Sequence, residues 1–267
     1  MVNQNKIQII SNTQIHDNYY QLRLRSDKGF ESVIPGQFVM IRLSDNYAPL
    51  LRRPFSIHNV FQDDNGVYCF DILYKVIGKG TRVLSEYLSN QFIDVLGPIG
   101  NGFHISESIK NVLLVSGGIG VAPMLFLTKC LLENGTKCHL INGGRTADDV
   151  LCTKHFQSMG IEVSIYTDDG SSGTSGFVTD NLAFYLKQKE YDMVYACGPQ
   201  PMLSKVSKIS KQMNVSCQIS LESYMACGMG ACLGCAVLSK KTNTSYLHVC
   251  NDGPVFSSER VNLENNV

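Results

Sequence analysis

The first third of the chain alternates short apolar runs with turn residues. Between Ile7 and about Phe103 these runs are rich in β-branched and aromatic residues, and turn signals such as DKGF, IPGQ and DDNG separate them. The pattern predicts strands rather than helices. Six strands at this spacing favour an antiparallel barrel or sandwich. We predict them at KIQII, YQLRLRS, QFVMIRLS, FSIHNVF, GVYCFDILYKV and FIDVLGP.

From about residue 111 the pattern changes. Compact apolar strands now alternate with segments of helical periodicity, which is typical of a doubly wound α/β domain with a parallel sheet. The predicted strands are NVLLVSG, KCHLING, IEVSIYT, DMVYACG and SCQISL, and the predicted helices span 123–133, 148–159, 178–187 and 201–213. The regularity ends after Ser220. The chain is therefore predicted to divide into a β-barrel (1–105), an α/β domain (106–220) and a C-terminal cysteine segment (221–267).

Composition and charge narrow the classes of function. Hydrophobic residues make up 44% and charged residues 17% of the 267 residues, as in an ordinary globular protein. Lys plus Arg equals Asp plus Glu at 23 each, and no basic run is present, so neither nucleic acid nor a membrane surface is an expected partner. The N-terminus shows no signal peptide. The longest uncharged run, 112–128, contains glycines and a proline, which predicts a strand, turn and helix rather than a membrane span.

The cysteines fall into two groups. Five of the ten stand singly in apolar or mixed surroundings, where a reduced core thiol is the expected role, and we therefore expect a cytoplasmic protein: Cys69, Cys130, Cys138, Cys152 and Cys217. Four gather near the C-terminus: Cys227, Cys232, Cys235 and Cys250. The first three have the C-x4-C-x2-C spacing of plant-type 2Fe–2S ferredoxins. Four cysteines also suit a structural zinc ion, and unliganded core thiols are a further alternative.

The glycines between these cysteines support the cluster interpretation. A loop that curls around two irons needs residues that accept positive φ and bring their N–H groups close to sulfur. We predict this role for Gly228, Gly230 and Gly234, with Ala226, Ala231 and Ala236 adding little bulk.

A second candidate site follows the first strand of the α/β domain. There the glycines of LLVSGGIGVAPM predict a turn whose N–H groups face a pyrophosphate, although G-x-G-x-x-P departs from the dinucleotide fingerprint and also suits a plain tight connection. The turn ACGPQPM should open on the same sheet edge. Asp168 or Asp169 could bind a ribose and favour NAD over NADP, or could simply form a turn. The candidate residues are Gly117, Gly118, Gly120, Pro123, Asp168, Cys197, Gly198, Pro199 and Met202.

A third candidate site lies in the barrel. In RRPFS, Arg53, Phe55 and Ser56 would project a cation, a ring and a hydroxyl from one strand. The segment GKGT would begin a helix with free N–H groups beside Thr81, which suits an anion. The alternative is that Arg52 and Arg53 are ordinary surface charges.

Taken in order, R-x-x-S, G-K-G-T, G-G-x-G-x-x-P, C-G-P-x-P-M and the cysteine segment resemble a known family. The first four resemble the ferredoxin–NADP reductase superfamily, and the whole chain resembles the electron-transfer subunits of bacterial NAD-dependent dihydroorotate dehydrogenases. The resemblance implies FAD held by Arg53, Pro54, Phe55, Ser56, Leu73, Tyr74, Lys75, Gly80 and Thr81. It also implies NAD at the glycine turns, with Cys197 nearest the nicotinamide–flavin stack, and a 2Fe–2S cluster on the four C-terminal cysteines.

The resemblance also implies a partner and a role. The partner would be an FMN-containing catalytic subunit in a two-plus-two heterotetramer, and electrons would pass from FMN through 2Fe–2S and FAD to NAD⁺ in pyrimidine (UMP) synthesis. This chain offers no acid–base pair for oxidising dihydroorotate, and its scattered histidines have a structural role by default. Three alternatives stay open: a flavin or ferredoxin reductase, a subunit of another redox complex such as a sulfide dehydrogenase, and a zinc-stabilised nucleotide-binding regulatory subunit.

Overall fold

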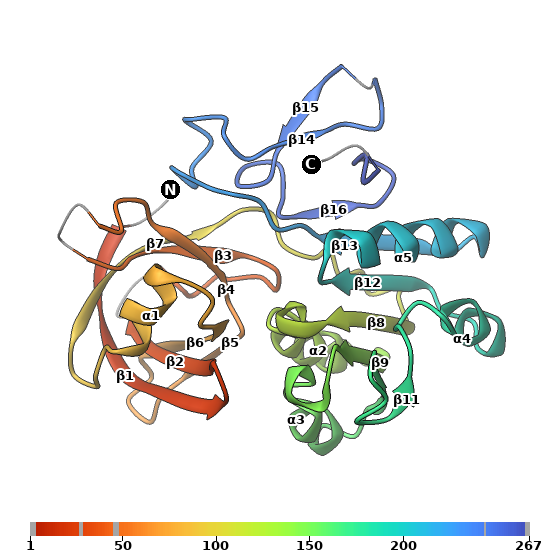
Figure 1. The fold of residues 1–267 in the computed structure, drawn as a ribbon, viewed down its shortest axis with the longest axis horizontal. Helices are drawn as coiled ribbons and strands as arrows, with labels where there is room; N and C mark the ends of the chain where they lie inside the picture. The colour runs from red at the N-terminus through yellow and green to blue at the C-terminus, as the bar shows by residue number, and fades with distance from the viewer. Residues whose placement is uncertain (1–3, 27–28, 45–47, 243, 265–267) are drawn as a thin grey trace.

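The strands form two seven-stranded sheets and one two-stranded sheet in the computed structural model, which describes residues 4–26, 29–44, 48–242 and 244–264. Figure 1 shows the N-terminal barrel beside the α/β layers, with the C-terminal segment lying across the top of both. Within the described residues, no helix combines the length and the apolar character needed to cross a bilayer.

The barrel is antiparallel, as predicted. Its strand order is β4-β3-β7-β1-β2-β6-β5, and the helix that GKGT predicts is present as α1 (Lys79–Ser85). The strands are β1 (Gln4–His16), β2 (Tyr19–Ser26), β3 (Phe38–Arg42), β4 (Arg53–Ser56), β5 (Asn59–Gln62), β6 (Tyr68–Lys75) and β7 (Phe92–Ile99).

The prediction of a single strand at FSIHNVF is wrong, because the chain changes partners in its middle. β4 pairs with β3, whereas β5 pairs with β6. At the break, the Ile57 N–H donates to Gln37 O at 3.0 Å and the His58 N–H donates to Asp71 O at 2.8 Å. Two short strands on different neighbours therefore replace one longer strand.

The second sheet is parallel except at one edge, with the order β11-β10-β9-β8-β12-β13-β16. β16 returns from the C-terminal segment and pairs antiparallel with β13. The strands are β8 (Asn111–Gly117), β9 (Lys137–Gly144), β10 (Glu162–Thr167), β11 (Thr174–Ser175), β12 (Met193–Cys197), β13 (Ser216–Ser220) and β16 (Val255–Ser257).

Four α-helices accompany this sheet: α2 (Met124–Glu133), α3 (Thr153–Ser158), α4 (Leu182–Gln188) and α5 (Gln200–Gln212). The 3-10 turn η1 (Gly118–Val121) precedes α2. The predicted helix over 148–159 is wrong in its first half. A 3-10 turn, η2 (Ala147–Asp149), occupies that part, and Cys152 takes a left-handed φ of 62° that cannot continue a helix.

The barrel and the α/β layers share buried side chains. Phe126 of α2 belongs to the core that fills the barrel, and Leu73 of β6 packs with Val121 and other residues on one face of the parallel sheet. The position of the glycine turn relative to the barrel is therefore set by packing on both sides.

The C-terminal segment carries β14 (Ala236–Leu238) and β15 (Tyr246–His248), which form an antiparallel pair. Backbone hydrogen bonds in addition to the β16–β13 pairing join this segment to the rest of the molecule. The Asn101 N–H donates to Gly253 O at 2.6 Å, and the Leu221 N–H donates to Pro254 O at 2.9 Å.

Candidate functional site

A cavity of about 610 Å³ opens between the barrel and the C-terminal edge of the parallel sheet. Both predicted glycine turns line it. The predicted residues in its wall are Lys75, Gly117, Gly118, Gly120, Asp168, Gly198, Pro199 and Met202. A cavity of this volume is in the range of small-molecule and cofactor sites.

The two turns are in direct contact. Residues 116 and 197 are paired in the parallel sheet, so β8 and β12 end side by side. A Cβ on Gly117 would lie 2.8 Å from the Met202 sulfur, and one on Gly120 would lie 2.6 Å from Gly198 Cα. Glycine at position 120 therefore permits a close approach of two backbones, as a pyrophosphate-binding edge requires, whereas the nearest neighbour of Gly117 is the flexible Met202 side chain.

Pro123 and Cys197 lie behind this wall. Pro123 is the N-cap residue of α2, and Cys197 is the last residue of β12, where it is buried. Burial raises the pKa of the Cys197 thiol far above its ordinary value, so the side chain is a neutral thiol.

The structure separates the roles of the two aspartates. Asp169 Oδ1 accepts hydrogen bonds from both the N–H and the hydroxyl of Ser171, at 2.9 and 2.6 Å, which is the turn-forming role. Asp168 lines the cavity instead. Of the two carboxylates, only Asp168 is therefore in the wall of the cavity.

In the barrel, the two arginines before β4 also differ. Arg52 forms an ion pair with Asp94 at 2.8 Å and stabilises the barrel. Arg53 has no carboxylate within ion-pair distance in the described part of the chain, and its Nη1 donates to Leu51 O at 2.7 Å. A Cβ on Gly80, in the first turn of α1, would lie 3.3 Å from Arg53 Nε. A cation and a helix N-terminus therefore meet, which fits a diphosphate.

Thr81 and the remaining residues of β4 complete this region. The Thr81 hydroxyl accepts hydrogen bonds from the N–H groups of Ile77 and Gly78, at 3.0 and 3.2 Å, and so holds the loop before α1. Pro54, Phe55 and Ser56 are all half-buried on β4. The first-turn N–H groups and the β4 side chains are available to a ligand that lies along this strand.

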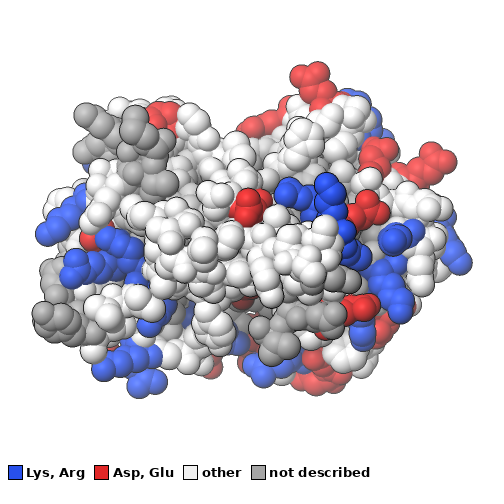
Figure 2. Space-filling view, turned by 90° about the horizontal axis from the view of Figure 1, so that it is seen from above, with Lys and Arg blue, Asp and Glu red and all other residues white. Residues whose placement is uncertain are grey.

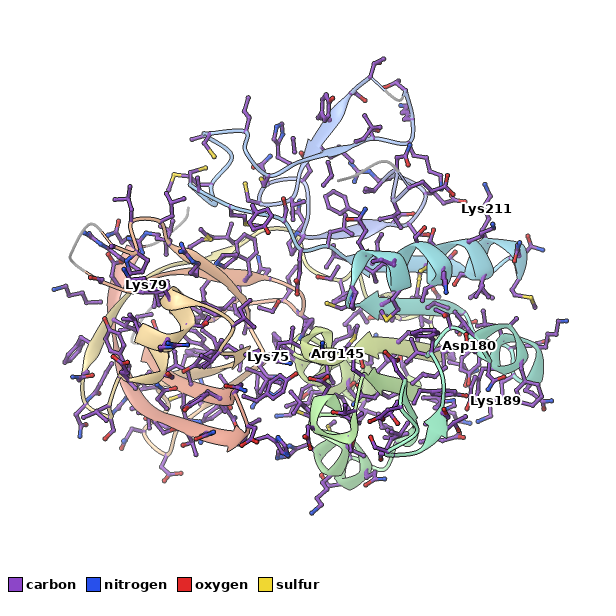
Figure 3. The ribbon with its side chains drawn as sticks, in the orientation of Figure 1. Lys75, Lys79, Arg145, Asp180, Lys189 and Lys211 are labelled. Atoms are coloured by element: carbon purple, nitrogen blue, oxygen red, sulfur yellow. The ribbon has the colours of Figure 1, made fainter. Side chains whose placement is uncertain are left out.

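Side chains of β6 alternate in direction, as a strand requires. Tyr74 points into the barrel, where its hydroxyl donates to Asn12 Oδ1 at 3.0 Å and its ring meets Phe55 edge-on. Leu73 packs toward the glycine turn. Lys75 lies at the boundary of the two sheets, where Figure 3 shows it near Arg145.

The structure adds a polar bridge that the sequence did not suggest. The carboxylate of Asp149, in η2, accepts hydrogen bonds from Tyr19 and from Lys75 of the barrel, the latter at 2.8 Å, and Arg145 lies 3.4 Å from it. Burial alone would raise the pKa of Asp149, but hydrogen bonds from Lys75 and Tyr19 lower it to about 2. All four side chains line the cavity.

In the cysteine segment, backbone N–H groups are directed at the thiols. Cys227 Sγ accepts from the N–H groups of Met229 and Cys232, at 3.4 and 3.3 Å. Cys250 Sγ accepts from Gly230 at 3.2 Å, and Cys235 Sγ accepts from the Cys250 N–H at 3.4 Å. Such donors stabilise negative sulfur and tune iron–sulfur clusters. Burial raises the pKa of Cys227, but the backbone donors lower it to about 7.

The four thiols come from two parts of the segment. Cys235 and Cys250 are buried with their sulfurs 3.3 Å apart, Cys227 is half-buried and Cys232 is exposed. In the described residues, no group of three or more His, Cys, Asp or Glu side chains is arranged around a single metal ion. The donor set fits a cluster of thiolate-bound irons with its exposed edge at Cys232.

The backbone of the cysteine loop differs from the prediction at one position. Gly228 and Gly230 take positive φ, at 71° and 80°, as expected. Gly234 is not among the residues with positive φ, and Leu233 takes 58° instead. A Cβ on Gly234 would meet the Cys232 sulfur at 3.6 Å, an ordinary contact distance, so neither the backbone conformation nor lack of space requires glycine there.

The cysteine loop rests on the barrel. A Cβ on Gly228 would lie 2.5 Å from Cγ of Met40 in β3. Met40 is paired with Pro54 of β4 in the sheet. The cysteine loop and the RPFS strand are therefore separated by only one strand.

Two family models match the chain. Residues 114–208 match an oxidoreductase NAD-binding domain, and residues 222–262 match the iron–sulfur cluster binding domain of dihydroorotate dehydrogenase B. A dihydroorotate dehydrogenase B (NAD⁺) electron transfer subunit from Lysinibacillus sphaericus is 39% identical over 98% of this chain and all of its own length. The corresponding protein of Caldanaerobacter subterraneus is 40% identical over 96% of this chain and 97% of its own. The chain belongs to this family.

Solved structures of reductases share the fold of this chain. The structure of an NADH-dependent reduced ferredoxin–NADP oxidoreductase, reported for flavin-based electron bifurcation, matches with a TM-score of 0.85 and 29% identity over 97% of this chain and 91% of that one. Phthalate dioxygenase reductase matches with a TM-score of 0.63 and 21% identity over 78% and 64% of the two chains, which shows a shared fold.

The sequence did not reveal the residues whose side chains connect the barrel to the α/β domain. Tyr19 and Asp149 belong to no motif, and their contact joins residues 130 positions apart. His58 lies two residues beyond the RPFS strand, but it is one of six histidines scattered along the sequence. The one signal in the sequence is that His58 lies close to the strand that carries the predicted FAD-binding residues.

Proposed function

We propose that this chain is the electron-transfer subunit of an NAD⁺-dependent dihydroorotate dehydrogenase in pyrimidine synthesis. It relays electrons from the FMN of a catalytic partner through 2Fe–2S and FAD to NAD⁺. The observation that carries this proposal is the packing of the cysteine loop on β3, one strand from the RPFS strand. The first glycine turn is contacted by Leu73 of β6 and by His58, two residues beyond that strand, so the three candidate sites are near one another, as a relay requires.

Each group has residues in this chain that suit it. Arg53 and the first turn of α1 would bind the FAD diphosphate, with Ser56 beside the flavin ring. The glycine turns and Asp168 would hold NAD, and the four C-terminal cysteines the cluster. When bound, FAD exchanges a hydride with NAD and single electrons with an iron–sulfur centre, which suits it to join the two. The chain supplies binding and orientation.

The face that carries the cysteine segment supports docking of a partner. Figure 2 shows a broad uncharged area across the middle of this face, with most charged side chains toward its sides. Three apolar or aromatic side chains of the cysteine segment are well exposed: Tyr224 (97%), Met229 (50%) and Leu233 (58%). A hydrophobic core with a polar rim is typical of protein interfaces. The partner proposed here is the FMN-containing catalytic subunit, in a two-plus-two assembly.

Two further assignments belong to this proposal. The chain divides into a flavin domain (1–105), an NAD domain (106–220) and a cluster segment (221–267), and β16 of the last part completes the sheet of the second. All ten cysteines are free of disulfides. Free thiols in this number favour a reducing compartment, the cytoplasm.

The test uses the chain purified anaerobically with its catalytic partner. The wild-type complex should show flavin and iron–sulfur absorption and form orotate with NAD⁺. Cys232→Ala should lose this activity, whereas Cys138→Ala, which removes a thiol from β9 far from the cluster, should retain it. Orotate formation that survives Cys232→Ala unchanged would refute the relay. A colourless protein containing zinc would refute the redox role altogether.

A further inference from the structure

His58 lies at the point where the RPFS strand leaves β3 and the chain crosses to β6. Its backbone N–H is fixed to Asp71 O at 2.8 Å, and its side chain is only 2% exposed. It is two residues beyond Ser56, so β4 and this hydrogen bond leave it little freedom to move. An imidazole held in this way can fix the position of a group to which it donates a hydrogen bond.

The ring reaches the turn that precedes α2. His58 Nδ1 lies 2.6 Å from the carbonyl oxygen of Ala122, which directly follows η1 of the glycine turn. A carbonyl only accepts hydrogen bonds, so Nδ1 carries the proton and donates it. Burial lowers the pKa of His58, which keeps the imidazole neutral.

The second ring nitrogen is accounted for as well. His58 Nε2 lies 4.0 Å from the sulfur of Cys152. Burial raises the pKa of that thiol to about 12, so it stays protonated and directs a weak S–H donor at the lone pair. Both nitrogens therefore favour one tautomer and one ring orientation.

Other contacts between the barrel and α2 hold the helix rather than the turn. Lys129 Nζ donates to Asn59 Oδ1 at 2.7 Å, and Phe126 packs into the barrel core. Among the hydrogen bonds of the described residues, the one from His58 is the one that joins a barrel side chain to the segment 117–123.

We propose that His58 is a positioning residue that fixes the distance between the glycine turn (residues 117–123), proposed to bind the nucleotide, and the RPFS strand, proposed to bind the flavin. It acts through the Ala122 carbonyl and touches neither cofactor. This inference rests on the proposed function, because it assumes that the turn and the strand hold the two reacting rings. Hydride transfer depends steeply on distance, and a misplacement of about 1 Å costs roughly a hundredfold in rate.

Three substitutions separate the hydrogen bond from the volume of the ring. His58→Asn keeps an N–H donor close to the position of Nδ1, His58→Leu keeps much of the volume without a donor, and His58→Gln moves the donor toward the position of Nε2. Each variant is purified as the complete complex. The measurements are bound flavin per chain, the rate of flavin reduction by NADH over a range of NADH concentrations, and amide hydrogen exchange of residues 117–123.

His58→Leu and His58→Gln should bind flavin normally but reduce it about 10- to 100-fold more slowly at saturating NADH, with a smaller change in the apparent Kd for NADH. Their exchange over residues 117–123 should be faster than in the wild type. His58→Asn should stay within about threefold of the wild-type rate and keep its protection.

Equal rates and equal exchange in wild type, Leu and Gln variants would overturn the inference. So would an Asn variant as slow as the Leu variant with full flavin. If the Leu variant does not fold, the comparison of Asn with Gln decides, and equal rates in these two overturn the inference. A wild-type complex whose flavin NADH does not reduce would instead refute the proposed function.

Discussion

Gly120→Ala tests whether the glycine turn is a nucleotide site or a plain connection. The added Cβ would lie 2.6 Å from the carbonyl carbon of Cys197 and from Gly198 Cα, and closer still to the Cys197 oxygen. Non-bonded heavy atoms prefer about 3.5 Å or more, so the two turns must separate by about 1 Å. The atoms in contact all belong to the backbone, of Cys197 at the end of β12 and of Gly198 after it, so no rotamer change can relieve the clash.

The expected effect has two parts. Overpacking of this kind destabilises a fold by about 1–3 kcal/mol, which lowers the unfolding midpoint by several degrees. If this edge is the nicotinamide site, as proposed, a displacement of about 1 Å there should slow flavin reduction by NADH about a hundredfold. Flavin content should not change, because the RPFS strand and α1 are not touched.

The assay is anaerobic stopped-flow reduction of bound flavin by NADH, with Gly135→Ala as the control. Gly135 has a φ of +73° and no atom within 4 Å of its added Cβ, so the substitution introduces strain of about 1 kcal/mol far from the cavity. It should lower stability and leave flavin reduction unchanged. If Gly120→Ala reduces its flavin at the wild-type rate and with the wild-type dependence on NADH, the turn is only a strand-to-helix connection.

Three other predictions follow from the same geometry. Gly228→Ala, which combines a φ of +71° with a contact of 2.5 Å to a barrel methionine, should lose most iron–sulfur absorption, whereas Gly160→Ala, with similar φ and open surroundings, should keep it. Asp149→Asn should lower the free energy of unfolding by about 1–2 kcal/mol after allowance for solvent. Because the folded pKa, about 2, lies below the ordinary 3.8, this stability is present above pH 4 and is lost only below it, so the difference from wild type should be constant in urea titrations between about pH 5 and 8. A difference that changes in that range would contradict the assignment of the shift. Arg53→Gln should release FAD, measured as flavin per chain after gel filtration, while Arg25→Gln, which removes an ion pair with Asp63 elsewhere in the barrel, should retain it.

Local patterns predicted the parts of the molecule that neighbours in sequence determine. The step from β8 through η1 to α2 follows from an apolar run, glycines and Pro123, all within a dozen or so residues. The fold class follows in the same way, because strand and helix periods can be read without knowledge of tertiary contacts. The candidate residues of each glycine turn were found for this reason.

Long-range contacts account for what the sequence did not predict. The break at Ile57 depends on hydrogen bonds to Gln37 and Asp71, which lie in different parts of the chain. In the cysteine loop, Leu233 rather than Gly234 takes positive φ, although propensity favours glycine for that conformation, so local propensity alone does not predict this part of the backbone.

The order of the sites in space differs from their order in sequence, and the difference has a physical consequence. The NAD domain separates the barrel from the cysteine segment along the chain, yet β16 and residues 253–254 return that segment to the barrel side. The cysteine loop then meets Met40 on β3, while His58 and Leu73 meet the nucleotide turn from β4–β5 and β6. The RPFS strand thus adjoins the cysteine loop through β3 and the glycine turn through His58, and under the proposed function these two are the one-electron site and the hydride site. NAD exchanges electrons only in pairs, so in this proposal it needs to contact the flavin and not the cluster. The arrangement lets the cluster and the nucleotide each approach the flavin by a separate route.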